Sequence, residues 1–263
     1  MDILRKSLAP VTAEAWEEIN KQAKKVFNSV LSARRFVDID GPKGWDFEAV
    51  SLGRLEVGPE KKGTVRYGIN KVLPLIESRV SFELDMWELD NAARGAEDLD
   101  LDAMEDAAKK IAEFEENVIY KGFNKSGVKG LKESSGHKAI KYPENIEDLP
   151  KVIAEIISHF VKSSVEGPYS LILSTDKWEA ISSYISGYPL KKVVKNLLEG
   201  NIILNPSSKD SFVVSERGGD FRLTLGQDLS IGYESHDTKN VQLYFTESFT
   251  FQVIDPAAVM IFT

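Results

Sequence analysis

The side chains best suited to catalysis are few in this chain and widely separated. The three histidines are His137, His159 and His236, and none has a second histidine or a carboxylate at metal-ligand spacing. The chain has no cysteine, which excludes a thiolate nucleophile, a disulfide and a cysteine-bound metal. We interpret the histidines as surface residues or as core residues whose ring nitrogens are hydrogen-bonded. The sequence assigns no catalytic residue and no metal ligand.

Carboxylates are the next candidates, because paired acids can exchange protons or bind metals. Glu113, Glu115 and Glu116 share one amphipathic segment, but the Glu-x-x-His repeat of a di-iron bundle is absent. We therefore expect these three glutamates to lie on a solvated helix face. The phosphate-binding glycine motifs and the G-x-S-x-G nucleophile elbow are also missing. The sequence favours a structural or binding protein over an enzyme.

Residues 101–122 form the segment around which the rest of the chain is organised. The apolar side chains recur at helical spacing and are Leu101, Met104, Ala107, Ala108, Ile111, Ala112, Phe114, Val118 and Ile119. Acidic residues fill the first turns, as the helix dipole favours, and Gly122 supplies a stop signal. At about 1.5 Å per residue the helix is roughly 30 Å long, so it needs a broad apolar surface from the strands around it.

The other segments supply that surface and a second lobe. Thr12 caps a predicted helix over residues 13–31. Residues 50–57 and 65–69 alternate apolar and polar side chains around a loop at residues 58–63, which predicts a long β-hairpin that projects from the body. Because an isolated hairpin is marginal in water, it must lie on its own body or on a neighbouring subunit. Residues near 130–205 alternate short strands with helices, as an α/β lobe does.

The overall charge limits the partners of the chain. The formal net charge is −8, which argues against a nucleic-acid partner and leaves no polybasic patch for a membrane. The first residues show no apolar core of a secretory signal, and no apolar run approaches membrane-spanning length. We expect a cytoplasmic protein without nucleic-acid or membrane partners.

A set of short motifs follows the order found in a known protein family. The motifs are Gly41-Pro42, Gly44-Trp45, Trp87-Glu-Leu-Asp-Asn91, Lys125-Ser-Gly-Val-Lys-Gly130, Glu166-Gly-Pro-Tyr169 and Val214-Ser-Glu-Arg-Gly-Gly-Asp220. From residue 4 to residue 262 the chain resembles the shell proteins of family 1 encapsulin nanocompartments, which are related to tailed-phage major capsid proteins.

The resemblance implies an α+β fold, the tailed-phage major capsid protein fold of the Hong Kong 97 type. That fold has a peripheral domain, an axial domain and an extended loop. The implied parts are residues 1–48 (N-terminal arm and helix, part of the peripheral domain), 49–70 (extended loop), 71–129 (peripheral domain with its spine helix), 130–211 (axial domain) and 212–263 (return strands of the peripheral domain).

The resemblance also implies a function. Members of this family self-assemble into closed icosahedral shells that enclose a cargo enzyme, commonly a ferritin-like ferroxidase or a dye-decolourising peroxidase, with roles in iron storage and oxidative stress. A C-terminal targeting peptide recruits the cargo to the inner wall. The implied cargo-peptide residues are Phe27, Val30, Leu31, Arg34, Asp38, Asp228, Leu229 and Ile231. The alternative is that these residues only pack the helix on the sheet.

Two further sites follow from the same resemblance. The implied pore loop at the five-fold axis is Ser183, Tyr184, Ile185, Ser186, Gly187, Tyr188, Pro189 and Leu190. An implied flavin contact consists of Arg79, Trp87 and Tyr188, although no cofactor is required and an interfacial tryptophan can serve packing alone. Two other functions remain open, a DNA-packaging capsid protein of an integrated phage and a soluble enzyme. The acidic net charge disfavours the capsid protein.

Overall fold

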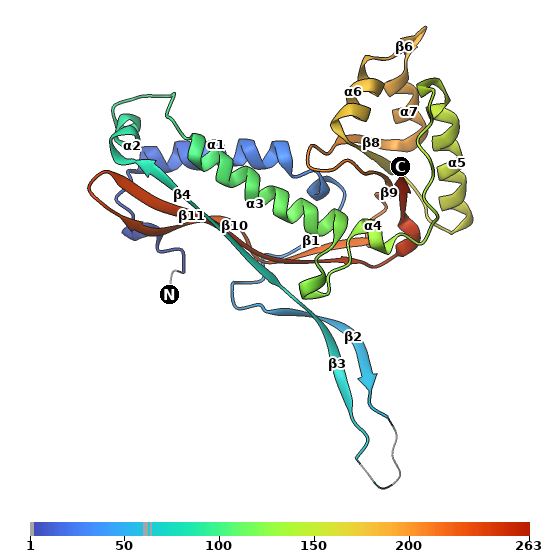
Figure 1. Ribbon diagram of the computed structural model, residues 1–263, viewed down its shortest axis with the longest axis horizontal. Coiled ribbons are helices and arrows are strands. Elements are labelled where there is room, and N and C mark those ends of the chain that lie inside the picture. Colours follow the sequence, from blue (N-terminus) through green and yellow to red (C-terminus); the bar gives the residue numbers. More distant parts are fainter. Residues whose placement is uncertain (1–2, 60–62, 64) are drawn as a thin grey trace.

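The protein has three visibly different parts. The computed structural model describes residues 3–59, 63 and 65–263. Figure 1 shows an elongated body with two helices above a sheet, a second lobe at one end of the body, and a two-stranded ribbon that projects from it. Residues 60–62 of the predicted loop at 58–63 lie outside the described residues.

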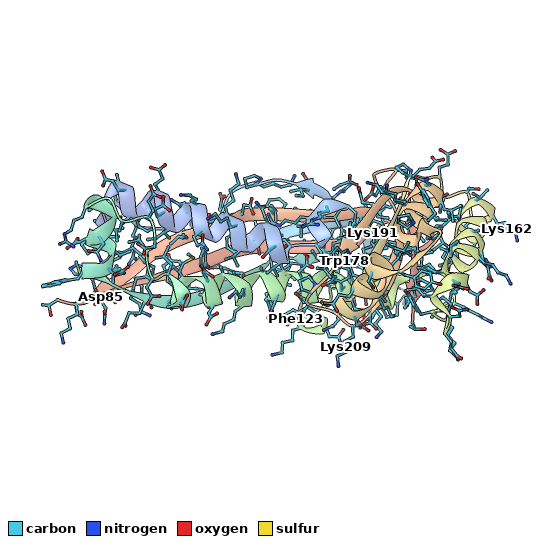
Figure 2. The ribbon with its side chains drawn as sticks, turned by 90° about the horizontal axis from the view of Figure 1, so that it is seen from above. Asp85, Phe123, Lys162, Trp178, Lys191 and Lys209 are labelled. Atoms are coloured by element: carbon cyan, nitrogen blue, oxygen red, sulfur yellow. The ribbon has the colours of Figure 1, made fainter. Side chains whose placement is uncertain are left out.

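The body is a four-stranded sheet covered on one face by two helices. In spatial order its strands are β1 (Asp38–Asp40), β10 (Phe221–His236), β11 (Asn240–Val253) and β4 (Ile76–Asp85). β1 runs parallel to β10, and the other pairs are antiparallel. Helices α1 (Ala13–Val30) and α3 (Asp102–Lys121) run side by side along this sheet (Figure 2). The predicted long helix therefore does have strands as its partner surface.

Local sequence explains where these two helices begin and end. The Thr12 hydroxyl accepts a hydrogen bond from the Ala15 amide at 3.2 Å, which confirms the predicted cap of α1. α3 ends before Gly122, whose φ of 88° a side chain would disfavour. The apolar stripes of both helices face the sheet, where Met104, Ile111 and Phe245 are fully buried.

The second lobe has its own four-stranded sheet. Its strands, in spatial order, are β12 (Val259–Phe262), β9 (Ser211–Ser215), β5 (Tyr169–Leu173) and β8 (Glu199–Leu204). Helices α5 (Leu149–Lys162), α6 (Thr175–Ser183) and α7 (Leu190–Leu198) belong to this lobe, as Figure 1 shows. The lobe thus has the strand and helix content that the alternating pattern predicts.

One boundary differs from the sequence expectation. Residues 212–263 were expected to return to the peripheral domain, and β10 and β11 do so. β9 and β12, however, pair with each other and β9 pairs with β5, so both lie in the second sheet. The reason is that the apolar faces of β9 and β12 complete a core with β5, which is buried along its whole length.

The ribbon consists of β2 (Ala49–Val57) and β3 (Gly68–Pro74). It confirms the hairpin that the alternating pattern predicts, and Figure 1 shows it pointing away from both lobes. The remaining elements are short: α2 (Met86–Ala93), α4 (Leu131–Ser134), β6 (Ile185–Ser186), β7 (Tyr188–Pro189), η1 (Lys6–Leu8), η2 (Ala33–Arg35), η3 (Asn124–Ser126), η4 (Ile146–Asp148) and η5 (Pro256–Ala258). No helix in the described part of the chain is long and apolar enough to cross a membrane.

Candidate functional site

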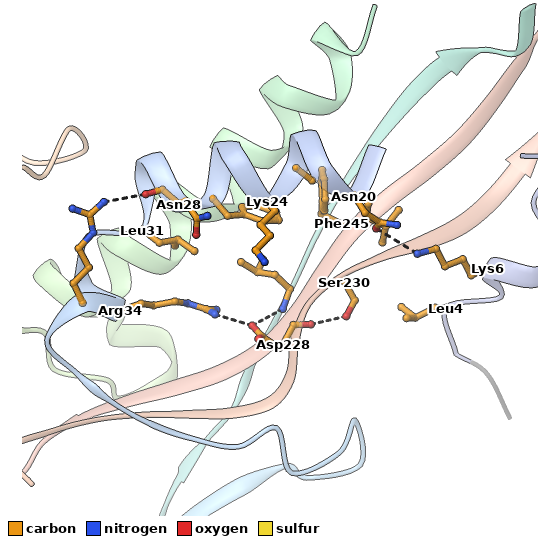
Figure 3. Close-up of a pocket in the computed structure, with 15 residues that line it drawn as sticks. Leu4, Lys6, Asn20, Lys24, Asn28, Leu31, Arg34, Asp228, Ser230 and Phe245 are labelled. Atoms are coloured by element: carbon orange, nitrogen blue, oxygen red, sulfur yellow. Dashed lines mark hydrogen bonds and ion pairs between the residues drawn. The ribbon is translucent and has the colours of Figure 1, made fainter. Parts of the chain in front are cut away.

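A pocket of about 620 Å³ lies between helix α1 and strand β10. Six of the eight cargo-peptide residues expected from the resemblance line it: Phe27, Leu31, Arg34, Asp228, Leu229 and Ile231. Figure 3 shows Lys24, Asn28 and Leu31 on the helix side, facing Asp228 and Ser230 on the strand side. The fold therefore brings together two segments that are about 200 residues apart in the sequence.

The other two expected residues lie elsewhere. Val30 is buried in the core beneath α1 and does not line the pocket. The Asp38 carboxylate accepts a hydrogen bond from the Gly219 amide at 2.6 Å, so it fixes the turn between β9 and β10. Neither side chain lines the pocket.

The pocket has an apolar floor and a polar rim. Phe27 packs edge-on against Phe245, with ring centroids 5.3 Å apart, and both rings line the cavity. The remaining lining residues are Leu4, Lys6, Asn20, Ala23, Lys24, Asn28, Arg35 and Ser230. Leu4 and Lys6 belong to the N-terminal arm, which carries no sequence signal that would have placed it here. This surface suits a ligand with apolar side chains and hydrogen-bonding main chain.

Arg34, at one end of the pocket, is surrounded by three carboxylates. Its Nε donates to Glu115 Oε1 at 3.0 Å, and its Nη2 donates to Glu115 Oε2 and to Glu247 Oε1, both at 2.6 Å. Its Nη1 donates to Asp228 Oδ1 at 2.8 Å. These bonds join η2, α3, β10 and β11, so Arg34 holds the body together and has few donors left for a ligand.

Burial controls the protonation of this cluster. Burial alone would lower the pKa of Arg34, but the hydrogen bonds and charges of Glu115, with those of Glu247 and Asp228, raise it above its ordinary value. Burial also raises the pKa of Glu247 well above its ordinary value, and the neighbouring Glu115 raises it further. The positive charge of Arg34 opposes the rise in the pKa of Glu247 and cancels it only in part.

A second buried acid lies one residue further along α3. Glu116 Oε1 accepts a hydrogen bond from the Ala33 amide at 2.9 Å, and Glu116 Oε2 accepts one from the Ser32 hydroxyl. Ser32 Oγ is also 2.8 Å from the Tyr120 hydroxyl oxygen. Burial raises the pKa of Glu116 to about 7, and the bonds from Ser32 and Ala33 oppose this shift only in part.

The expectation that the α3 glutamates lie on a solvated face was therefore wrong for two of the three. Glu113 is exposed, but Glu115 and Glu116 are fully buried. The physical reason is that Arg34, Ser32 and the Ala33 amide offer enough donors to compensate the loss of water.

The residues expected to contact a flavin do not converge within one chain. Trp87 lies on α2 and is 77% exposed, whereas Tyr188 lies in β7 on the second lobe, at the opposite end of the molecule in Figure 1. The Arg79 guanidinium lies 4.1 Å from the centroid of the Tyr244 ring. One subunit therefore does not form a flavin site from these three residues.

The expected pore loop is the outermost part of the second lobe. Residues 183–190 form the end of α6, the small β6–β7 hairpin and the start of α7, and Figure 1 shows β6 at the tip. Ile185 and Tyr188 are exposed, whereas Leu190 is buried. Over the described ranges, no group of three or more histidine, aspartate or glutamate side chains is arranged to hold a metal ion.

Comparisons with known proteins identify what this architecture resembles. A family profile described as "encapsulating protein for peroxidase" matches residues 1–250. A type 1 encapsulin shell protein of Rhodococcus erythropolis is 38% identical, with 99% of each chain covered. A type 1 encapsulin shell protein of Rhodospirillum rubrum is 39% identical, with 99% of this chain and 96% of the relative covered.

Among solved structures, the virus-like particle protein of Pyrococcus furiosus aligns with a TM-score of 0.67 at 16% identity. This alignment covers 94% of this chain and 98% of the other chain. At this level of identity the likeness concerns the fold alone. It confirms the predicted α+β capsid fold of the Hong Kong 97 type.

Proposed function

The chain belongs to the type 1 encapsulin shell protein family, and we propose that it self-assembles into a closed icosahedral compartment in the cytoplasm. The observation that carries this proposal is the ribbon β2–β3. Leu55, Val57 and Ile69 remain 59%, 55% and 64% exposed there, although they stand on a long β-hairpin. Leu55 and Val57 share one face of the ribbon, and Ile69 lies on the other face. Exposed apolar surface of this kind marks an interaction site, and neighbouring copies of the chain can cover it.

We further propose that the compartment encloses a separate enzyme and has no catalytic activity of its own. The family description refers to a peroxidase, which supports a dye-decolourising peroxidase as cargo, and a ferritin-like ferroxidase is the second candidate. Such cargoes would give the compartment a role in oxidative stress or iron storage. The pocket between α1 and β10 is proposed to receive the targeting peptide, because its volume and apolar floor suit a short peptide segment.

We propose that residues 183–190 line an opening where several second lobes meet, because this hairpin is the outermost part of its lobe. Shell formation requires no cofactor. Since one chain holds Trp87 and Tyr188 at opposite ends, a flavin that touched both would have to lie between two subunits.

Substitution of Phe27 tests the cargo pocket. In Phe27→Ala the apolar floor is lost, so we expect shells of normal size that contain little cargo when host proteins are identified by mass spectrometry. Phe123→Ala is the matched control, because it removes the same ring from a position outside the pocket. Normal cargo content in Phe27→Ala shells would refute the assignment of the pocket. Nucleic acid in place of a protein cargo would support the DNA-packaging alternative.

A further inference from the structure

Four buried polar side chains connect the body to the second lobe. Glu116 and Tyr120 lie one turn apart on α3, which runs toward the second lobe in Figure 1. Ser32 precedes η2 in the body, and Asn205 follows β8 in the second lobe. Each of the four residues is at most 1% exposed, so their polar atoms depend on partners inside the protein.

The hydrogen bonds of the first three side chains run in one direction when Glu116 carries its charge. The Ser32 hydroxyl donates to Glu116 Oε2, and Glu116 Oε1 accepts from the Ala33 amide at 2.9 Å. A hydroxyl has a single hydrogen, and that of Ser32 goes to Glu116. Tyr120 is therefore the donor in the 2.8 Å contact between its hydroxyl oxygen and Ser32 Oγ. This leaves the Tyr120 oxygen as an acceptor for the next group.

Asn205 is the last side chain of this chain of hydrogen bonds. Its Oδ1 accepts from the Ser207 amide at 2.9 Å, and its main-chain amide donates to the Leu173 carbonyl at 2.8 Å. Among the described residues, Asn205 Nδ2 has no partner at normal hydrogen-bond distance. The Asn205 side chain nevertheless acts on the Tyr120 hydroxyl, where it opposes the rise in the pKa of Tyr120 that burial causes. Asn205 Nδ2 is therefore the donor available to the Tyr120 oxygen.

A proton on Glu116 reverses the direction of these bonds. Protonated Glu116 donates to Ser32 Oγ, Ser32 then donates to the Tyr120 oxygen, and the Tyr120 hydrogen turns away from Ser32. That hydrogen meets Asn205 Nδ2, which is also a donor. The Asn205 amide becomes an acceptor only when it turns its Oδ1 toward Tyr120. The turn removes the acceptor of the Ser207 amide.

Glu116 is the member of this chain of bonds that changes its charge near neutral pH. Burial raises its pKa to about 7, and the charge of Glu115 on the same helix adds to that rise. Arg35 of η2 acts on Tyr120 and lowers the pKa of its hydroxyl, against the larger effect of burial. From the second lobe, Phe212 of β9 packs on the Tyr120 ring with centroids 5.4 Å apart and brings no charge.

We propose that these four side chains form a proton-controlled link between the two lobes, in which protonation of Glu116 loosens the 205–210 connection between β8 and β9. The link lies within one subunit, so it depends neither on assembly nor on cargo. A buried chain of hydrogen bonds transmits the change because reversing one bond forces its neighbour to reverse as well.

The link acts on the first half of the connection and leaves its second half in place. There the Asp210 amide donates to Ser208 Oγ at 3.1 Å, and the Asp210 carboxylate forms an ion pair with Lys132 at 3.0 Å. Neither contact involves Asn205. The Ser207 amide should therefore respond to the proton on Glu116, whereas the Asp210 amide should not.

Amide hydrogen exchange of the purified full chain tests the link. Exchange is measured at pH 5.5 and pH 8.0 by mass spectrometry, with electron-transfer fragmentation to resolve single amides. Each rate is divided by that of the unfolded chain at the same pH, which removes the intrinsic effect of pH. Protection of the Ser207 amide should be about tenfold lower at pH 5.5, because its acceptor is then lost. Protection of the Asp210 amide should stay within about twofold.

Two variants interrupt the link at different points. Glu116→Gln presents an NH2 donor to Ser32, as the protonated acid does, so the Ser207 amide should have low protection at both pH values. Tyr120→Phe removes the hydroxyl in the middle, so protection should differ by about twofold or less between them. Tyr169→Phe is the matched control, because it removes a buried hydroxyl that bonds to the Val165 carbonyl elsewhere in the second lobe. It should keep the tenfold dependence.

Three results would overturn the inference. One is constant protection of the Ser207 amide in the unmodified protein, and another is a change of the opposite sign. The third is a tenfold dependence that survives in Tyr120→Phe, because the signal would then reach residues 205–210 by another route. If Tyr120→Phe does not fold, Glu116→Gln decides alone, and a pH dependence retained in that variant would refute the link.

Discussion

Two long antiparallel ribbons of this chain have opposite surroundings. β10 and β11 lie beneath α1 and α3, where Phe245 and Phe249 are fully buried. β2 and β3 project from the body, and apolar side chains such as Leu55 and Ile69 are exposed on them. Both ribbons are antiparallel pairs with register shifts, so the hydrogen-bonded ladder does not distinguish them.

The difference in burial indicates that the β10–β11 ribbon stabilises the subunit and that the β2–β3 ribbon binds another surface. Burying a large apolar side chain contributes about 1.5–3 kcal/mol, and the β10–β11 ribbon obtains this contribution within its own chain. The β2–β3 ribbon does not obtain it until another surface covers the ribbon. Substitutions in the first ribbon should therefore change subunit stability, and substitutions in the second should change assembly.

The largest effect on stability is expected from Phe249→Ala. The Phe249 ring is fully buried and meets the Phe114 ring of α3, with centroids 6.2 Å apart. Its removal should lower the free energy of unfolding by about 3–5 kcal/mol, measured by denaturant titration of dissociated subunits. Leu55→Ala is the comparison in the exposed ribbon and should change that free energy by less than about 0.5 kcal/mol. Similar losses in both variants would abolish the distinction between the ribbons.

A pH-dependent effect is expected from Glu116. Its pKa is about 7 in the folded subunit, above the ordinary value of 4.5, so the folded state binds the proton more tightly than the unfolded state. The contribution of Glu116 to stability is therefore fully present below about pH 4.5 and is lost as the pH rises through 7. The loss reaches roughly 3 kcal/mol at higher pH.

In Glu116→Gln this loss should disappear, because glutamine carries no charge, keeps one oxygen to accept from the Ala33 amide and can donate its NH2 group to the Ser32 oxygen. The measurement is the free energy of unfolding between pH 5 and pH 8. Glu113→Gln, at an exposed position of the same helix, is the control and should leave the pH dependence unchanged. The attribution to Glu116 is wrong if the Glu116→Gln protein keeps the slope of the unmodified protein.

The smallest effect on subunit stability, with the largest effect on assembly, is expected from Leu55→Asn. The substitution leaves the β2–β3 pairing intact and removes exposed apolar surface. The fraction of protein in large particles should fall about tenfold in size-exclusion chromatography, while the unfolding free energy stays within about 0.5 kcal/mol. Arg54→Gln, next to it on the same strand, should assemble normally. Deletion of residues 59–63, in the connection between β2 and β3, should also reduce assembly more than folding.

The sequence predicts those parts of the fold that local patterns specify. Thr12 and Gly122 mark the ends of helices, and the alternation around Leu55 marks the ribbon. The sequence does not predict that β9 and β12 belong to the second sheet, because the pairing of Val214 with Val259 joins segments that are far apart in the chain. Such pairing depends on tertiary packing, and it produces no repeating pattern of apolar residues in the local sequence.

The pocket shows the same limit. The resemblance supplied Phe27 and Ile231, which the fold does bring together, but not the arm residue Leu4. The burial of Glu115 had a local signal, since it stands four residues after Ile111 on the apolar stripe. What the sequence could not provide was its partner, because Arg34 lies 81 residues away and reaches Glu115 only in the folded chain.

Electron microscopy of the purified chain tests most directly whether copies of this chain assemble through surfaces such as the β2–β3 ribbon. We expect closed, hollow particles of uniform size at micromolar protein concentration, and a Leu55→Asn protein that yields mostly small species under the same conditions. A stable, folded single subunit as the main species of the unmodified protein would contradict a shell built from this chain.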